Sequence, residues 1–230
     1  MTVGRIVDAA VELLVESGLA ALSMRKVADR LGVGAMSLYT YVPGKDELVM
    51  LAVERAFGQL PRALPAGVGW RGQLETLAAA YWDLYRDQPW LLDVPVTRPV
   101  LGPNAFDRYE LELRAVDGIG LSELEMTGVI ELIQGHVESV ARRATGATVD
   151  ARRSGVSDDE WWEQVSPVLE EVLADRDYPV SSRVGEAIGA PHTDPVFLLR
   201  FGLDRILDGV EHLLASRPGP AGPEADAGEA

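Results

Sequence analysis

The sequence predicts an all-α protein in which a small N-terminal three-helix, helix-turn-helix domain precedes a larger helical bundle. Apolar residues recur at helical spacing along most of the chain, whereas the alternating patterns typical of strands are scarce. Three short helical segments follow one another at the N-terminus, and a Gly-Val-Gly turn joins the last two. With 230 residues, 47% hydrophobic and 25% charged, the chain has the composition of a globular protein with a sizeable core.

The first two predicted helices are defined by their apolar faces and by the residues that bound them. Residues 5–16 carry apolar side chains on one face. Ser17-Gly18 then ends the helix, because glycine is favoured just past a helix C-terminus. Ser23 is a suitable N-cap for a second helix over residues 24–31.

The third predicted helix is short and carries an unusual set of side chains. It follows the turn at residues 32–34, spans residues 35–42 and stops at Pro43-Gly44. Leu38 and Val42 face the core, which leaves two tyrosines and two hydroxyl groups on the outer face. A helix with these groups exposed is suited to probing the major groove of DNA.

The remaining helices belong to a second, larger unit. Prolines and glycines interrupt the helical pattern at residues 61–69, so we place a domain boundary near residue 60 and a helical domain at 61–216. The segment 217–230 has no large apolar residue and is expected to be a disordered tail. A fourth helix is expected to start near Lys45. Further helices are expected over residues 70–87, 104–117, 121–145, 158–175, 181–189 and 195–216.

The charge of the chain is unevenly distributed. The formal net charge is −15, but residues 1–60 carry only −1 and residues 24–45 carry +3. A phosphate backbone responds to local charge, because salt screens interactions beyond roughly 8–10 Å. The basic window is therefore compatible with DNA binding, and chance clustering of four cations is the alternative.

Several functional classes are excluded or disfavoured by composition. The chain has no cysteine, and none of its apolar runs reaches the roughly 18 residues needed to span a membrane. It also has no apolar signal core at the N-terminus, so we expect a cytoplasmic protein without a membrane partner. The three histidines lack metal-binding spacing, and phosphate-loop and nucleophile-elbow motifs are missing. We therefore expect no enzyme activity, no cofactor and no metal.

Two stretches resemble a known family of regulators. Leu22–Val33 (LSMRKVADRLGV) is similar to the second helix and turn of tetracycline-repressor-type (TetR family) proteins, and Ser37–Leu48 (SLYTYVPGKDEL) to their third helix and the start of the fourth. Phe201–Glu211 (FGLDRILDGVE) resembles the last helix of the tetracycline-repressor-like C-terminal domain. The resemblance implies a homodimeric transcriptional regulator, usually a repressor, that a small molecule releases from a palindromic operator.

The resemblance also implies roles for individual residues at the DNA. The start of the second helix lies near the DNA backbone, with Met24 and Arg25 followed by the cation Lys26. The recognition helix opens near the bases with Met36 and Ser37. Tyr39 and Tyr41 contact phosphates, Thr40 contacts a base edge or methyl group, and Lys45 reaches a phosphate at the fourth helix N-terminus. A place at the edge of the core is the alternative for Tyr39.

Two pairs of glycines indicate close helix packing. Gly128 and Gly135 are seven residues apart within 121–145, as are Gly202 and Gly209 within 195–216. A glycine inside a helix costs about 1 kcal/mol relative to alanine, so paired glycines on one face need a reason. A four-helix dimer interface supplies one, and intrachain packing of the same helices is the alternative.

An aromatic set in the larger unit suggests a ligand site. A largely apolar or aromatic effector would be lined by Trp82, Tyr85, Trp90, Phe106, Tyr109 and His136, and an ordinary hydrophobic core is the alternative. The fourth helix ends without the histidine that accompanies magnesium in tetracycline repressors, which again predicts no metal. A helical small-molecule-binding or adaptor protein without DNA binding remains the alternative function.

Overall fold

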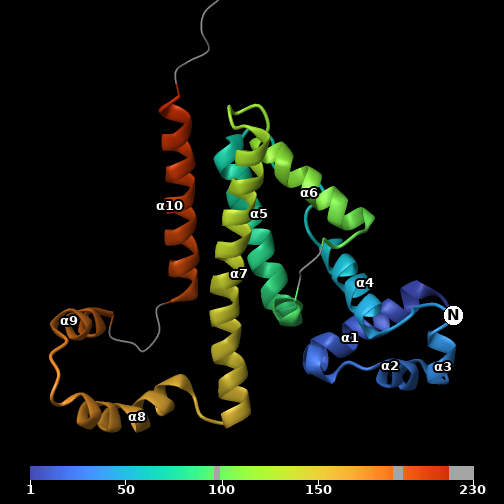
Figure 1. Ribbon diagram of the computed structural model, residues 1–230, viewed down its shortest axis with the longest axis horizontal. Helices are drawn as coiled ribbons and strands as arrows, with labels where there is room; N and C mark the ends of the chain where they lie inside the picture. The colour runs from blue at the N-terminus through green and yellow to red at the C-terminus, as the bar shows by residue number, and fades with distance from the viewer. Residues whose placement is uncertain (96–98, 189–193, 218–230) are drawn as a thin grey trace, which may run out of the picture.

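The computed structural model describes residues 1–95, 99–188 and 194–217, and the side chains of residues 147–154, 158 and 159 are not described. Within these ranges the chain forms ten α-helices, one 3-10 helix and no strand, which confirms the predicted all-α class (Figure 1). The elements are α1 (Val3–Ala21), α2 (Met24–Leu31), α3 (Ala35–Leu38), α4 (Lys45–Phe57), α5 (Gly69–Asp87), the 3-10 helix η1 (Pro89–Asp93), α6 (Pro103–Val116), α7 (Glu123–Ser154), α8 (Asp158–Leu173), α9 (Pro179–Ile188) and α10 (Pro195–Ala215).

The N-terminal helices pack around a small core of their own. Helix α1 contacts both α2 and α4, and Ile6, Val27, Leu38 and Leu48 at the centre are fully buried. The regular helix of α1 breaks at Gly18, whose φ of 74° and ψ of 173° are non-helical, as the Ser17-Gly18 pair predicts. This break lets the chain turn toward α2.

Both ends of α2 are formed by the residues that the sequence indicates. The Ser23 hydroxyl accepts a hydrogen bond from Lys26 N at 3.3 Å, which satisfies one of the free N–H groups of the first turn. Gly32 ends the helix in the left-handed conformation with φ 68°, which costs little only for glycine. The direction of the turn into α3 is therefore determined by one serine and one glycine.

Helix α3 is shorter than predicted. The prediction of a helix over 35–42 is corrected, because α3 ends at Leu38 and residues 39–41 form a turn. Val42 precedes Pro43, whose ring disfavours the helical conformation in the preceding residue, and Thr40 is β-branched. Tyr39, Thr40 and Tyr41 therefore lie in a turn after the helix rather than on it.

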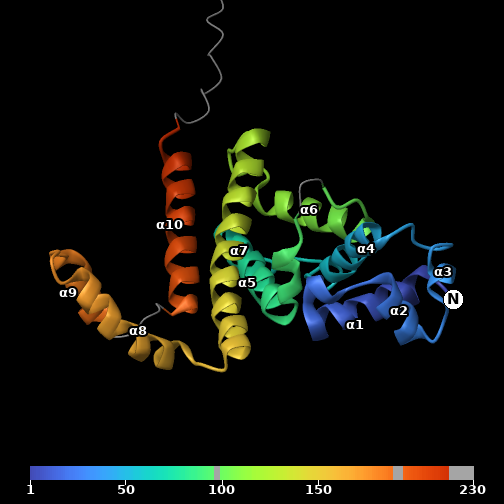
Figure 2. The same cartoon turned by 60° about the horizontal axis from the view of Figure 1, so that its bottom comes forward.

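The larger unit is built around α7. Figures 1 and 2 both show α7 with α10 on one side and α5 and α6 on the other. Helix α6 also contacts α4, and η1 contacts α1, so the apolar core continues from the N-terminal helices into the body. The two units thus share one core, and α4 is the helix that runs from the first into the second.

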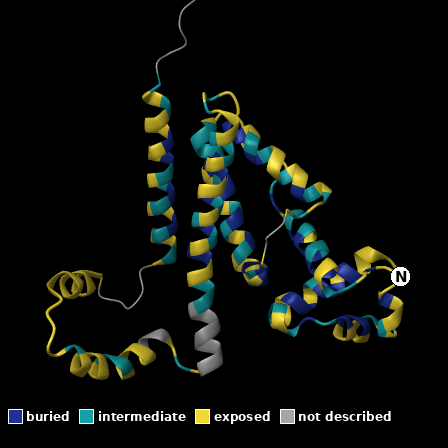
Figure 3. Ribbon diagram, in the orientation of Figure 1, coloured by how far each residue is buried: buried dark blue, intermediate teal, exposed yellow. Residues whose placement is uncertain are grey.

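Helices α8 and α9 form an arm that projects away from the body in both views (Figures 1 and 2). Ser157 begins α8 with a capping box: its hydroxyl accepts from Glu160 N at 3.2 Å, and Glu160 accepts from Ser157 N at 2.8 Å. Most of the arm is exposed (Figure 3). Its large exposed apolar residues are Trp161, Trp162, Val168, Leu169, Val172, Tyr178, Val180, Val184 and Ile188.

Other predicted elements agree in place and differ at their ends. The helix predicted over 121–145 is α7, which continues to Ser154, and the short helix predicted over 181–189 is α9. The predicted disordered tail lies outside the described residues from position 218 onward. None of the helices in the described ranges is long and apolar enough to cross a membrane.

Helices α7 and α10 approach closely at one histidine. His136 on α7 lies against Gly202 on α10, and its Nε2 is 3.0 Å from the carbonyl oxygen of Leu199. A Cβ on Gly202 would overlap the imidazole ring. The glycine therefore makes room for a side chain of its own chain, which is the intrachain alternative to a dimer contact.

This packing makes the effect of Gly202→Ala depend on His136. In the wild type the substitution displaces the ring, and overpacking of this kind costs roughly 1–3 kcal/mol. In a His136→Ala background the ring is gone, so alanine stabilises α10 by about 1 kcal/mol through its helix propensity. Urea unfolding of the four proteins measures both free energies, and the same sign in the two backgrounds would contradict this packing.

Candidate DNA-binding and effector-binding sites

The surface formed by α2, the turn and α3 is polar and open. Leu38 and Val42 point inward and are fully buried, whereas Met36 exposes 80%, Tyr39 45% and Tyr41 41% of their surface. Ser37 and Thr40 are exposed as well. Five of the residues expected at DNA therefore lie on one accessible surface, and Tyr39 is not part of the core.

Met24 does not join this surface. It is only 7% exposed and belongs to the core that α2 forms with α1. This corrects the expectation for its side chain, because Met24 occupies the first turn of α2 at a position that faces inward. Only its backbone lies near the site.

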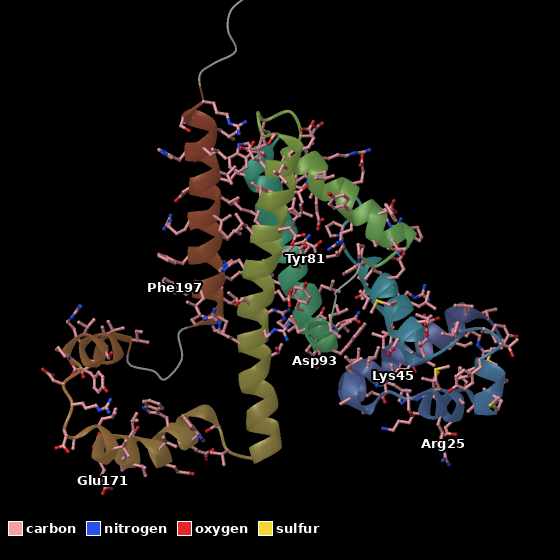
Figure 4. The ribbon with its side chains drawn as sticks, viewed as in Figure 1. Arg25, Lys45, Tyr81, Asp93, Glu171 and Phe197 are labelled. Atoms are coloured by element: carbon pink, nitrogen blue, oxygen red, sulfur yellow. The ribbon has the colours of Figure 1, made fainter. Side chains whose placement is uncertain are left out.

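The cations of the basic window fall into two groups. Arg25 and Lys26 are exposed on α2, and none of the ion pairs in the described ranges includes them; Figure 4 shows Arg25 at the outer edge of the helix. Arg30 instead contacts Glu12 at 3.1 Å and Glu16 at 2.5 Å on α1, and its hydrogen bond to Glu16 lowers the pKa of that carboxyl. Arg30 thus connects α2 to α1. The positive charge available to DNA is therefore smaller than the +3 counted over residues 24–45.

Lys45 and Ser37 are engaged with backbone carbonyl groups. The ammonium of Lys45 at the start of α4 donates to Leu19 O at 3.2 Å, next to the break in α1. The hydroxyl of Ser37 donates to Gly34 O at 2.6 Å. Lys45 keeps two further N–H donors, so its predicted contact with a phosphate is compatible with this geometry and remains a prediction.

The six predicted ligand residues differ widely in exposure. Trp90 is 2% exposed and donates from Nε1 to the side chain of Gln88 at 3.1 Å. Trp82 and Tyr85 are half-buried on α5, whereas Phe106 and Tyr109 on α6 expose 63% and 43%. His136 faces α10, and a ligand site shared by these six residues stays a prediction.

A cleft lies elsewhere, between the end of α4 and α6. Its volume is about 290 Å³, and its walls include Phe57, Leu60, Asn104, Arg108 and Leu111. None of the six predicted ligand residues lines it. The cleft sits where the DNA-binding helices meet the body.

A buried polar cluster adjoins this cleft. Glu112 on α6 is 1% exposed and accepts hydrogen bonds from the Tyr81 hydroxyl and from Gln134 Nε2, the latter at 2.7 Å. Arg108 donates to the Tyr81 hydroxyl at 3.0 Å, and its guanidinium lies 4.5 Å from the centre of the Phe57 ring. Tyr81, which Figure 4 labels, belongs to α5. The cluster thus joins α4, α5, α6 and α7.

The cluster perturbs the acidity of its members. Burial raises the pKa of Glu112, although the Arg108 guanidinium and the bonds from Tyr81 and Gln134 act in the opposite direction. Burial and the neighbouring Glu112 carboxylate raise the pKa of Tyr81 well above its usual value. Burial also raises the pKa of Tyr85, which stacks on Tyr81, to about 12.

This cluster is not among the sites predicted from the sequence. The available signal was the position of Arg108 and Glu112, which are four residues apart on the same side of α6 as the buried Ala105 and Ala115. Ionisable side chains on the inward face of an amphipathic helix are rarely buried without a partner. That anomaly could have drawn attention to α6.

A second contact fixes α4 to α6. The Glu54 carboxylate on α4 accepts hydrogen bonds from Asn104 N at 2.7 Å and Ala105 N at 3.0 Å. Asn104 Nδ2 returns a bond to Glu54 O at 3.1 Å. These are free N–H groups at the start of α6, so one helix caps another.

The four predicted interface glycines are not equivalent. Gly128 and Gly135 on α7 and Gly209 on α10 are exposed, and a Cβ on any of them would meet no atom within 4 Å. Gly202 contacts His136 of its own chain. Three glycines therefore leave open surface on α7 and α10.

The described residues contain no group of three or more His, Asp or Glu side chains that could hold a metal ion.

Two family models match the chain: "Bacterial regulatory proteins, tetR family" over residues 6–51, and "Tetracyclin repressor-like, C-terminal domain" over residues 61–214. The chain belongs to the TetR family. It is therefore a DNA-binding transcriptional regulator, as its helix-turn-helix motif predicts.

Similar proteins support this placement. The HTH-type transcriptional repressor DrrR1 of Streptomyces coeruleorubidus is 43% identical over 97% of this chain and 82% of its own length. The class D tetracycline repressor protein of Escherichia coli is 38% identical over 33% of this chain and 36% of its own length. The TetR family protein ActR of Streptomyces coelicolor, solved in complex with actinorhodin, has the same fold, with a TM-score of 0.74 and 22% identity over 94% of this chain and 99% of that chain.

The raised pKa of Glu112 predicts a pH dependence of stability. A carboxyl group whose folded pKa exceeds its unfolded value of about 4.3 stabilises the fold most at low pH, and that contribution is lost as pH rises through the folded pKa. We therefore compare the unfolding free energies of the wild type and of Glu112→Gln. The wild-type value minus the variant value decreases as the pH rises from 4 to 8. Urea unfolding at several pH values measures this difference. Glu110→Gln, on the exposed side of α6, is the control, and a difference for Glu112→Gln that grows with pH would contradict the assigned sign.

Proposed function

We propose that this protein is a homodimeric repressor that acts in the cytoplasm, binds a palindromic operator and is released from it by a small molecule. The observation that carries the proposal is the exposed polar surface of the helix-turn-helix, with Leu38 and Val42 holding it to the core. The decisive experiment is an electrophoretic shift of the DNA upstream of its own gene. An adaptor without DNA binding predicts no shift.

The side chains at this surface divide by the part of DNA that they suit. The cations Arg25 and Lys26 project from α2 and suit phosphates, which position the protein without reading sequence. Thr40 and Ser37 present hydroxyl groups that suit base edges. Two copies of this surface would read half-sites about 34–36 Å apart, one helical turn of DNA.

The exposed surfaces of α7, α10 and the arm support a homodimer. Gly128, Gly135 and Gly209 leave room for a helix to approach closely, and Phe197 and Phe201 on α10 expose 54% and 53%. Trp161 and Trp162 on α8 expose 50% and 40%. Apolar patches of this kind mark interaction surfaces, and a second copy of the chain covers them by continuing the α7–α10 packing.

Release by a ligand requires two states of the dimer that differ in the placement of the recognition helices. The ligand must prefer the state that does not fit the operator, because equal affinity for both states shifts nothing. A coupling of about 1–3 kcal/mol changes operator affinity roughly 5- to 150-fold. Helix α4 is the candidate lever, because it begins at Lys45 and ends at the cleft beside α6.

Substitutions at the DNA surface should separate phosphate contacts from base contacts. Lys26→Ala weakens binding to operator and random DNA alike, and it lowers the slope of log K against log salt by about one unit per lost contact in each subunit. Thr40→Ala instead changes which sequences are preferred. The control is Arg86→Ala, since Arg86 lies on α5, outside the helix-turn-helix, and pairs with Asp83.

Fluorescence anisotropy with labelled operator and random duplexes at four salt concentrations measures these effects. Equal salt slopes for the wild type and Lys26→Ala would remove Lys26 from the phosphate contacts. An unchanged sequence preference for Thr40→Ala would place base readout on other residues.

The dimer surface can be tested at its exposed glycines. Gly209→Leu places a bulky side chain where α10 would meet the partner, so it raises the dimer dissociation constant and lowers operator affinity. Gly4→Leu, at the exposed start of α1, is the matched control and leaves the dimer intact. Analytical ultracentrifugation measures the dimer dissociation constant of both variants. A wild type that sediments only as a monomer at micromolar concentration would contradict the proposal.

A further inference from the structure

Two atoms of the buried polar cluster lack hydrogen-bond partners. In the part of the chain that the structure describes, Arg108 Nε and Glu112 Oε2 are buried and unpaired. Buried polar atoms are nearly always paired, so an unpaired donor and an unpaired acceptor in one cluster need an explanation. Both atoms belong to the same cluster, whose other bonds involve Tyr81 and Gln134.

These atoms lie behind the wall of the cleft between α4 and α6. Arg108 is itself part of that wall, and its Nη1 is 3.7 Å from Glu112 Oε1. The two residues are four positions apart on α6 and therefore share a face. A molecule that enters the cleft meets Arg108 first and has Glu112 behind it.

The surroundings of Arg108 are aromatic. The Phe57 ring centre lies 4.5 Å from the guanidinium carbon, and that of Tyr81 lies 5.9 Å away. Flat rings beside a planar guanidinium offer stacking surfaces for another planar group. A planar aromatic molecule therefore fits this place better than a bulky aliphatic one.

The hydrogen-bonding pattern narrows the chemistry of the ligand. Arg108 Nε–H needs an acceptor, and the Glu112 carboxylate oxygen needs a donor. An anion would pair with the arginine but meet the glutamate charge, and an ester-like group would leave the glutamate unpaired. A group with acceptor and donor side by side, such as a primary amide or a lactam, satisfies both.

We propose that Arg108 and Glu112 are the polar recognition pair of the effector site, and that the effector is a planar aromatic molecule with an adjacent acceptor and donor. This proposal rests on the proposed function only in calling the ligand an effector. Phe57 is the last residue of α4, so a ligand that draws Arg108 from its ring acts directly on the helix that begins at Lys45.

Three small probes test the chemistry with the full-length protein. They are 2-naphthamide, which has both groups; methyl 2-naphthoate, which lacks the donor; and 2-naphthoate, which is anionic. Two-ring probes suit a cleft of about 290 Å³. Calorimetric titration should give a dissociation constant for 2-naphthamide about tenfold or more below those of the other two.

Matched variants on α6 locate the binding. Glu112→Gln replaces the acceptor Oε2 with an amide donor and should remove the advantage of 2-naphthamide over its methyl ester. Arg108→Lys, which lacks Nε, should weaken both. Glu110→Gln is the control, because Glu110 lines the same cleft but bonds to Arg114 at 2.8 Å on the exposed side.

The proposal is overturned if no probe binds, if the three probes bind equally, or if Glu110→Gln has the same effect as Glu112→Gln. Far-UV circular dichroism identifies a variant that does not fold, and the comparison of probes on the wild type then decides alone. The operator shift without ligand is a separate readout. If the protein binds DNA and no probe binds, only the proposed ligand chemistry is wrong. If a probe binds and the operator does not shift, the proposed repressor function is wrong instead.

Discussion

The carboxylate of Glu54 is the contact on which the arrangement of the two units depends. Helix α6 begins with Gly102 and Pro103, which supply no capping side chain, and Glu54 on α4 accepts from its free N–H groups. The geometry of such a cap is strict, because both helix ends must stay within hydrogen-bond distance. With η1 packed on α1, it fixes the DNA-binding helices to the body at two points. Movement of α6 is then passed to α4 rather than absorbed by a loose linker.

The buried arginine and glutamate of α6 add a constraint of a different kind. Replacing a buried ion pair with apolar residues of similar volume is often neutral or stabilising, so stability alone gives no reason to keep Arg108 and Glu112. What the pair provides is a set of oriented polar groups in a site of low dielectric, where a partner of the wrong hydrogen-bonding pattern is penalised strongly. Such a site gives discrimination between ligands at the expense of some stability.

Local signals carried the sequence predictions, and contacts between distant elements limited them. Ser23, Gly18 and Gly32 act on their own neighbours, so the ends of α1 and α2 could be predicted. The burial of Met24 and the pairing of Arg30 with Glu12 and Glu16 depend on how α2 packs on α1. The spacing of Arg108 and Glu112 points to α6, but their partners Tyr81 and Gln134 come from α5 and α7, which no spacing along one helix predicts. The six predicted ligand residues stay a prediction, because a ring on an amphipathic helix has no preference for a pocket over a core or a surface.

The acidic character of the chain has a consequence for how the regulator finds its target. With a formal charge of −15, with Arg30 held by two glutamates and with few exposed cations at the helix-turn-helix, the protein can neutralise few phosphates at once. Affinity for arbitrary DNA grows with the number of phosphates neutralised. We therefore expect molecules of this regulator to spend little time bound to non-operator DNA and to search for the operator mainly by diffusion through solution. A given number of copies then leaves more of them free to occupy the operator, because the many competing sites in the genome retain each copy only weakly.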